Sequence, residues 1–153
     1  MKLEKYLKAE NIFIKDSYKD TDLFYADFSL FLKKKGIVDD NEKIKRLFIK
    51  RENVQSTAIG RGVAAPHIFS DEFSEFILTV ALIKEGMEYK APDEQKVFIV
   101  FLIMSDDRDV GLHLKNLAHI ARLTRSTALG ERIKDITDAT QLIELIKEQE
   151  ALI

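Results

Sequence analysis

The three histidines are the side chains of this sequence best suited to chemistry near neutral pH. The 153 residues include His67, His113 and His119 and no cysteine, which excludes thiol nucleophiles, thiolate metal sites and disulfides. The ordinary pKa of imidazole is about 6.5, so a neutral ring is available as a nucleophile at neutral pH. We therefore weigh the histidines first as catalytic candidates.

His67 ends the small-residue stretch "TAIGRGVAAPH", residues 57–67. Pro66 fixes its own φ and two alanines precede it, so we expect His67 on a stiff loop after a strand-like segment, which suits a pre-positioned nucleophile. Gly60 and Gly62 allow close backbone approach. The "GRG" between them matches no nucleotide-binding fingerprint, and a turn or bulge explains the two glycines equally well.

His113 lies on the apolar stripe of a predicted helix. On a helical wheel it falls between Leu117 and Ile120, in a stripe that also includes Leu114, so the side chain is expected to face inward. It is close to the predicted helix start at residues 106–109, where positive partial charge favours a neutral ring and attracts anions. The alternative is a core histidine hydrogen-bonded to a carbonyl group.

Two further side chains are open to a structural or a chemical interpretation. His119 lies about 120° from His113 around the helix, which excludes a metal site shared on one helical face and indicates a boundary position. Arg51 falls near the end of a predicted helix. It is either a solvated helix-end charge or the partner of a bound anion.

The elements that must position these side chains indicate an α/β fold, a mixed β-sheet flanked by helices. Apolar spacing and capping residues predict helices over 20–36, 40–53, 110–126, around 128–135 and over 138–150. Strands are predicted over 76–89 and 96–105, and the second is apolar enough to be a buried central strand. No linker or repeat interrupts the chain, so residues 1–153 are expected to form a single domain.

Composition excludes several classes of function. The net charge of −2 comes from 24 basic and 26 acidic residues, mixed along the chain, so we expect no nucleic-acid partner. The start is charged, and the longest apolar run, 97–104, is far shorter than the ~20 residues of a membrane helix, which predicts a soluble cytoplasmic protein without direct membrane insertion. The sequence contains no HExxH, GxSxG, GxxxxGK(S/T) or CxxC motif, so the chemistries of these motifs are not indicated.

The line "RENVQSTAIGRGVAAPH", residues 51–67, resembles the phosphorylation-site signature of the type 2 enzyme IIA family. This is the fructose/mannitol branch of the bacterial phosphoenolpyruvate-dependent sugar phosphotransferase system (PTS), and it includes the nitrogen-regulatory IIA proteins. A second block, "HLKNLAHIARL" at 113–123, resembles the downstream histidine helix of that family, and "APDEQKVFIVFLI" at 91–103 resembles the loop and strand before it. The residues at the expected spacing in the first block are Arg51, Glu52, Thr57, Ile59, Gly60, Val63, Ala64, Pro66 and His67.

The resemblance implies a single-domain sandwich of the mannitol/fructose IIA type that acts as a phosphotransferase, with no cofactor. A phosphocarrier protein of the HPr type would donate the phosphoryl group, and a IIB domain would accept it. The implied site consists of His67 as the phosphorylated nucleophile, His113 as the second active-site histidine, Arg51 beside the phosphate, and Thr57, Gly60 and Gly62 as supports of the phosphate or its loop.

Two alternatives remain beside sugar transport. A nitrogen-regulatory protein would use the same phosphohistidine as a signal to bind regulatory targets. A binding module would keep the fold without phosphorylation, although the presence of Arg51, His67 and His113 together argues against it. Two positions depart from the family pattern: Ala65 stands where a larger aliphatic residue is usual, and Ile68 where a small residue is usual. Ile68 bears most on how a phosphoryl donor approaches.

Overall fold

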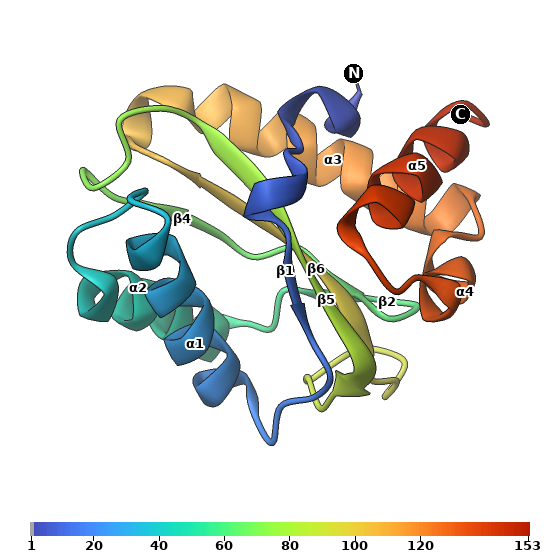
Figure 1. Cartoon of the computed structure of the whole chain (residues 1–153), viewed down its shortest axis with the longest axis horizontal. Coiled ribbons are helices and arrows are strands. Elements are labelled where there is room, and N and C mark those ends of the chain that lie inside the picture. Colours follow the sequence, from blue (N-terminus) through green and yellow to red (C-terminus); the bar gives the residue numbers. More distant parts are fainter. Residues whose placement is uncertain (1) are drawn as a thin grey trace.

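Two long antiparallel strands, β5 and β6, form the centre of a six-stranded mixed sheet (Figure 1). The computed structural model describes residues 2–153. The order is β1-β5-β6-β3-β2, and β4 also pairs with β6. β1, β3 and β4 run parallel to their partners, so the sheet is mixed as expected. The strands are β1 (Phe13–Lys15), β2 (Ala58–Gly60), β3 (Val63–Ala64), β4 (His67–Phe69), β5 (Ile77–Met87) and β6 (Val97–Ser105).

The predicted helices are all present, with ends shifted by a few residues at most. Asp20 and Asp40 cap the first two helices by accepting hydrogen bonds from Leu23 N and Lys43 N. The α-helices are α1 (Thr21–Lys34), α2 (Asn41–Val54), α3 (Val110–Ser126), α4 (Leu129–Arg132) and α5 (Ala139–Glu150). The 3₁₀ turns are η1 (Leu3–Tyr6), η2 (Ala9–Asn11), η3 (Asp107–Asp109) and η4 (Ile133–Asp135).

The sheet is buried on both faces, which is why β6 is apolar at nearly every position. Val100 and Leu102 belong to the core under α1 and α2, whereas Phe101 and Ile103 belong to the core under α3, α4 and α5. Because side chains alternate across a strand, two helical layers need two apolar faces. Figure 1 shows α1 and α2 on one side of the central strands and α3 to α5 on the other.

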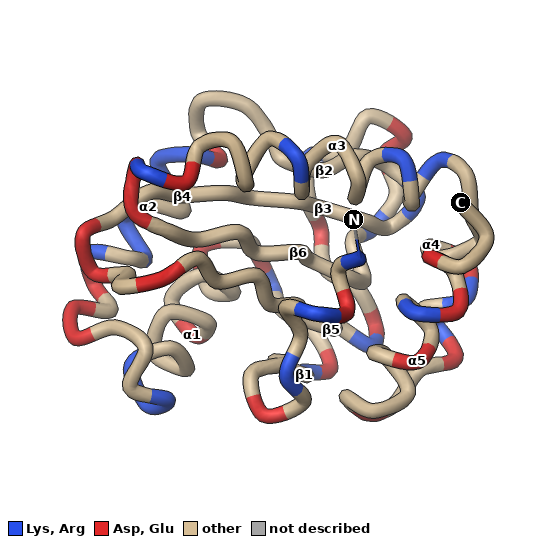
Figure 2. The backbone as a smooth tube through the Cα atoms, turned by 90° about the horizontal axis from the view of Figure 1, so that it is seen from above, with Lys and Arg blue, Asp and Glu red and all other residues tan. Residues whose placement is uncertain are grey.

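Charged residues of both signs are spread over the periphery of the molecule. In Figure 2 they lie on helices and loops and at the ends of β1 and β5, whereas the strands β3, β4 and β6 carry none. Over residues 2–153, no helix combines the length and the apolar character needed to cross a membrane.

The "GRG" segment forms the turn between β2 and β3. Arg61 has a φ of +57° between Gly60 and Gly62, whose φ angles are also positive. Its guanidinium Nη1 donates to the carbonyls of Thr124 and Arg125 at 3.0 Å each, which caps the C-terminal end of α3. The turn therefore ties the sheet to the helix that carries His113.

Gly130 packs directly against this turn, and we expect Gly130→Ala to destabilise the protein. Alanine favours a helix by about 1 kcal/mol over glycine, but its Cβ would lie 2.0 Å from the carbonyl oxygen of Arg61. Overpacking of this kind costs about 1–3 kcal/mol or more, so the free energy of unfolding should fall in urea denaturation. Gly111→Ala is the matched control, because its Cβ meets nothing within 4 Å. A Gly130→Ala protein as stable as wild type would contradict this account of the turn.

Candidate functional site

Sheet topology brings the chain around His67 to the end of β6. β4 runs parallel to β6 with His67 beside Ile103 and Phe69 beside Ser105, and Ile103 N donates to Pro66 O at 3.1 Å. α3 begins a few residues after Ser105, so its first turn lies next to β4. The expectation that His67 lies on a loop was wrong: it is the first residue of β4, because the backbone after Pro66 pairs with β6.

The His67 ring is half-buried with its two nitrogens in different surroundings. Its Nδ1 is buried and has no hydrogen-bond partner within residues 2–153. No hydrogen bond from the described residues reaches Nε2 either, and Nε2 is not among the buried unpaired atoms, so it is the nitrogen open to solvent. Burial lowers the pKa of His67, and the nearby positive charge of Arg51 lowers it further. The ring is therefore neutral near pH 7, as a nucleophile requires.

His113 packs against His67 with only 1% of its surface exposed. The two ring centroids are 5.8 Å apart at an interplanar angle of 81°, and Phe69 stacks on His113 at 4.2 Å. His113 Nε2 lies 2.6 Å from Ser105 Oγ, so its partner is a hydroxyl group and not the carbonyl of the core-histidine alternative. Burial, then the neighbouring His67, lowers the pKa of His113 to about 4, with Asp109 opposing. The inward orientation predicted for His113 is confirmed.

The apolar stripe of α3 differs from the expectation at one position. Leu114 is 63% exposed, and Val110, one turn earlier, is 46% exposed. Each residue advances about 100° around a helix, so the residue directly after a fully buried His113 is carried off the buried face. Both side chains lie on the exposed side of the turn that begins α3.

Arg51 lies near the end of α2 and is held by Gln55, the residue directly after that helix. Its Nη1 donates to Gln55 O at 2.7 Å. The Glu52 carboxylate accepts from Thr57 N at 3.2 Å, from the Thr57 hydroxyl, and from the Tyr89 hydroxyl at 2.5 Å. These bonds close the chain from α2 to β2 into a short loop, which supports Arg51 beside His67.

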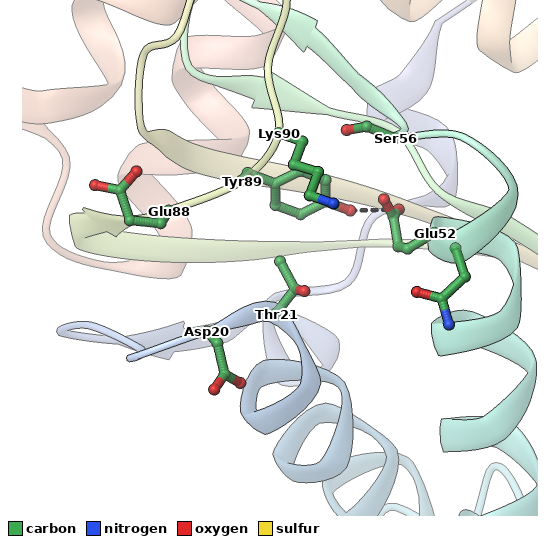
Figure 3. Close-up of a pocket in the computed structure, with 8 residues that line it drawn as sticks. Asp20, Thr21, Glu52, Ser56, Glu88, Tyr89 and Lys90 are labelled. Carbon is green, nitrogen blue, oxygen red and sulfur yellow. Dashed lines mark hydrogen bonds between the residues drawn. The ribbon is translucent and has the colours of Figure 1, made fainter.

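Sequence reasoning missed the two tyrosines of this network. Tyr25 from α1 donates to Glu52 Oε1 at 3.2 Å and lies 2.7 Å from the Tyr89 hydroxyl. Burial is the main cause that raises the pKa of both tyrosines far above the ordinary value, with the Glu52 charge adding to it, so both remain protonated donors. Figure 3 shows Glu52 directed from α2 toward the Tyr89 hydroxyl. No local pattern marks these positions, which lie far from Glu52 in sequence.

The Glu52 network borders a pocket of about 350 Å³ (Figure 3). Neither His67, His113 nor Arg51 lines it. The pocket is lined by Asp20, Thr21, Glu52, Asn53, Ser56, Glu88, Tyr89 and Lys90.

The structure does not bring Gly60 and Gly62 to the ring of His67. Gly62 O accepts from Phe98 N at 2.8 Å, whereas His67 pairs with Ile103. Five residues along β6 correspond to roughly 16 Å, too far for these glycines to contact a phosphoryl group on His67. Thr57, in contrast, belongs to the Glu52 network described above.

His119 lies at a boundary position, as expected. Its Nε2 is 2.6 Å from the buried Glu150 carboxylate, which also accepts from Leu3 N at 2.7 Å. His119 thus helps to join the two chain ends to α3. In residues 2–153 no group of three or more histidine or acidic side chains could hold a metal ion.

The buried His113 predicts a specific dependence of stability on pH. The unfolded chain binds a proton on each ring near pH 6.5, whereas folded His113 does so only near pH 4. As the pH falls from 6.5, the unfolded state binds more protons, so the free energy of unfolding should fall, by up to about 1.4 kcal/mol per pH unit for His113.

Urea denaturation between pH 6.5 and 5, above the range in which ordinary carboxylates titrate, measures this slope. His113→Gln should show a clearly shallower slope. Equal slopes in the variant and in wild type would mean that His113 does not supply the effect.

Comparison with solved structures supports the same fold. The nitrogen regulatory protein IIA-Ntr from Neisseria meningitidis has a TM-score of 0.82 at 19% identity, over 94% of this chain and 98% of that one. Mannitol IIA from Escherichia coli has a TM-score of 0.73 at 20% identity, over 91% and 97%. These likenesses confirm the predicted mixed sheet flanked by helices.

Sequence relatives and a family model agree with that fold. A fructose-specific EIIABC component from Bacillus subtilis is 23% identical over 98% of this chain, and the chain spans 24% of that protein. A nitrogen regulatory protein from Bradyrhizobium diazoefficiens is 28% identical over 72% of both chains. The family model described as "Phosphoenolpyruvate-dependent sugar phosphotransferase system, EIIA 2" matches residues 5–149. This chain belongs to that family.

Proposed function

We propose that this protein is a phosphoryl-carrier IIA component of the PTS, which accepts a phosphoryl group on His67 from an HPr-type protein and passes it to a IIB domain. The observation that carries the proposal is the His67 ring itself. Its Nε2 is open to solvent, its Nδ1 is buried, and it packs against a second, fully buried histidine. The family membership supports phosphoryl transfer as the chemistry of this ring.

The mechanism needs positioning and charge stabilisation. The lone pair of His67 Nε2 attacks the phosphorus of the donor phosphohistidine as the donor N–P bond breaks. Pairing with β6 and packing against His113 hold the ring in place, which lowers the entropic cost of reaching an in-line geometry. The Arg51 guanidinium offsets the charge of the transferring oxygens. The donor N–P bond is already activated, so the step requires no nucleotide.

A IIB domain is the proposed acceptor in the sugar pathway. Mannitol IIA from E. coli, which shares this fold at a TM-score of 0.74, has been solved in complex with phosphorylated mannitol IIB. Fructose-specific relatives favour a role in sugar uptake. The exposed Val110 and Leu114, in the part of α3 that carries His113, offer apolar contacts to such a partner.

The alternative is a nitrogen-regulatory role, in which the phosphohistidine controls binding to other proteins. The nitrogen regulatory relative and the IIA-Ntr fold support it. Loss of phosphorylation is the weakest of the three hypotheses, because a pure binding module has no need to keep His67 neutral beside Arg51 and against His113.

The test is phosphorylation of the purified protein by phosphoenolpyruvate, enzyme I and HPr, followed by intact mass measurement. We expect an acid-labile gain of one phosphoryl group. Subsequent transfer of that group to a fructose or mannitol IIB domain would support the sugar role. If the protein keeps its phosphoryl group in the presence of each of these IIB domains, the regulatory role is supported. No gain with any HPr-type donor would overturn the proposal.

A further inference from the structure

Ser105 is a polar residue at the end of an otherwise apolar strand. It is fully buried at the last position of β6, directly beside Phe69 of β4. Its Oγ lies 2.7 Å from the carbonyl oxygen of Asp106 and 2.6 Å from Nε2 of His113. A buried hydroxyl that bonds both a carbonyl oxygen and His113 is well placed to control the protonation of the His113 ring.

The number of available protons determines how these three groups pair. The Asp106 carbonyl can only accept, so it takes the single proton of the Ser105 hydroxyl, and the remaining Oγ lone pairs then accept from His113 Nε2–H. The other tautomer would place a proton on His113 Nδ1, which is buried and has no partner among the described residues. A buried donor without an acceptor is costly. The Nε2–H tautomer is thus the one in which every proton has an acceptor.

The tautomer of His113 bears on His67 because both rings bury an unpaired Nδ1. These are two of the four buried side-chain atoms without a partner in residues 2–153, and they belong to rings that meet edge to face at 5.8 Å. A nucleophilic Nε2 on His67 requires the ring proton on Nδ1. Active-site hydrogen bonds are often long in a free protein and tighten when the reacting group binds. One Nδ1–H and one Nδ1 lone pair would then satisfy each other.

We propose that Ser105 is a positioning residue, which holds His113 as the Nε2–H tautomer and so reserves the His113 Nδ1 lone pair for the Nδ1 proton of His67. The catalytic groups are the two histidines, and Ser105 acts through one of them. This inference rests on the proposed phosphoryl transfer for its second half, whereas the tautomer itself exists without any transfer.

The donor N–P bond breaks, its electron pair stays on the donor nitrogen, and the donor leaves as a neutral imidazole that keeps the proton on its other nitrogen. The His67 Nε2 lone pair forms the new N–P bond, which makes the His67 ring cationic while Nδ1 still carries its proton. That proton moves to His113 Nδ1, and the resulting imidazolium, held at Nε2 by Ser105, places a positive charge beside the phosphoryl group. The proton returns when the phosphoryl group leaves.

Ring nitrogen spectra of the ¹⁵N-labelled protein test the first half directly. Long-range ¹H–¹⁵N correlations distinguish the two neutral tautomers and the imidazolium. We expect His113 as Nε2–H in the free wild-type protein, as imidazolium after phosphorylation, and as a mixture or Nδ1–H in Ser105→Ala. A wild-type His113 in the Nδ1–H form overturns the proposal without any variant, so poor folding of Ser105→Ala would not leave it untested.

Phosphorylation kinetics test the second half. Ser105→Ala should slow transfer from phospho-HPr about tenfold at saturating donor, the effect of losing one buried hydrogen bond, and Ser105→Thr should restore it. Ser70→Ala is the matched control: this serine lies at the same sheet edge, and its hydroxyl accepts from Glu72 N at 3.1 Å, away from the two histidines.

The outcomes separate this inference from the proposed function. If wild type is phosphorylated and Ser105→Ala keeps both the wild-type tautomer and rate, the inference fails and the phosphoryl relay stands. A folded Ser105→Thr as slow as Ser105→Ala also counts against the hydroxyl. If wild type is not phosphorylated, the relay fails, and the spectrum of the free protein still decides the tautomer.

Discussion

Replacing His67 with alanine is expected to abolish phosphorylation by phospho-HPr. No other histidine of the chain presents a nitrogen in the same way: His113 is 1% exposed, and His119 is engaged with Glu150. The phosphohistidine relay needs a neutral ring nitrogen open to the donor, and in the described structure Nε2 of His67 meets that need. The acid-labile mass gain should fall from one phosphoryl group to none.

His119→Gln is the control for this experiment, because it also removes one histidine and keeps a donor for Glu150. It should be phosphorylated like wild type. Both variants should retain a cooperative thermal transition, since the His67 ring is only half-buried and makes no side-chain hydrogen bond to the described residues. An undiminished mass gain in His67→Ala would place the phosphoryl group on another residue and remove the basis of the mechanism.

The second large effect is expected for Arg51→Gln, which should slow phosphorylation about 100-fold, the magnitude typical of removing one preorganised electrostatic donor. Arg51 is close enough to His67 to lower its pKa, so its charge also acts on the phosphoryl oxygens that approach that ring. Loss of this charge should in addition let the pKa of His67 rise toward its ordinary value. Single-turnover transfer and a pH titration of the ring measure the two effects.

Arg46→Gln makes the same change of charge on the exposed side of α2 and should leave the rate near that of wild type. Arg51→Lys should recover only part of the loss, because an ammonium group lacks the planar fork that pairs with phosphoryl oxygens. Equal rates for Arg51→Gln and Arg46→Gln would show that Arg51 is an ordinary helix-end charge.

Much of the architecture could be predicted from local signals. The helices from α1 to α5 follow apolar spacing and capping residues, and Asp20 and Asp40 cap their helices as those signals indicate. The unbroken apolar run of β6 predicted a central strand, because a strand covered by helices on both faces needs apolar side chains on both. The short strands β1 to β4 escaped detailed prediction. Two or three residues carry too little periodicity to be recognised.

Part of the candidate site could likewise be predicted from the sequence, and part could not. Arg51, His67 and His113 follow from residue chemistry and from the resemblance to the family, and the structure brings these three together. Their catalytic roles, and the extent of 1–153 as one domain, stay predictions. Gly60 and Gly62 were expected to support the phosphate or its loop, and their turn contacts the end of α3 through Arg61. A glycine pair signals an unusual backbone, and it does not say which surface the backbone meets.

The sequence by itself therefore determined the helices, the buried central strand, the family and the histidine most suited to carry phosphate. Only the tertiary structure decided what holds that histidine and its neighbours. Tyr89 reaches Glu52 across 37 residues, and Ser105 meets His113 because β6 ends beneath the first turn of α3. Local patterns arise from neighbours within one or two turns. A hydrogen bond between distant elements depends on how the sheet and helices pack, and a single sequence carries no separate signal for it.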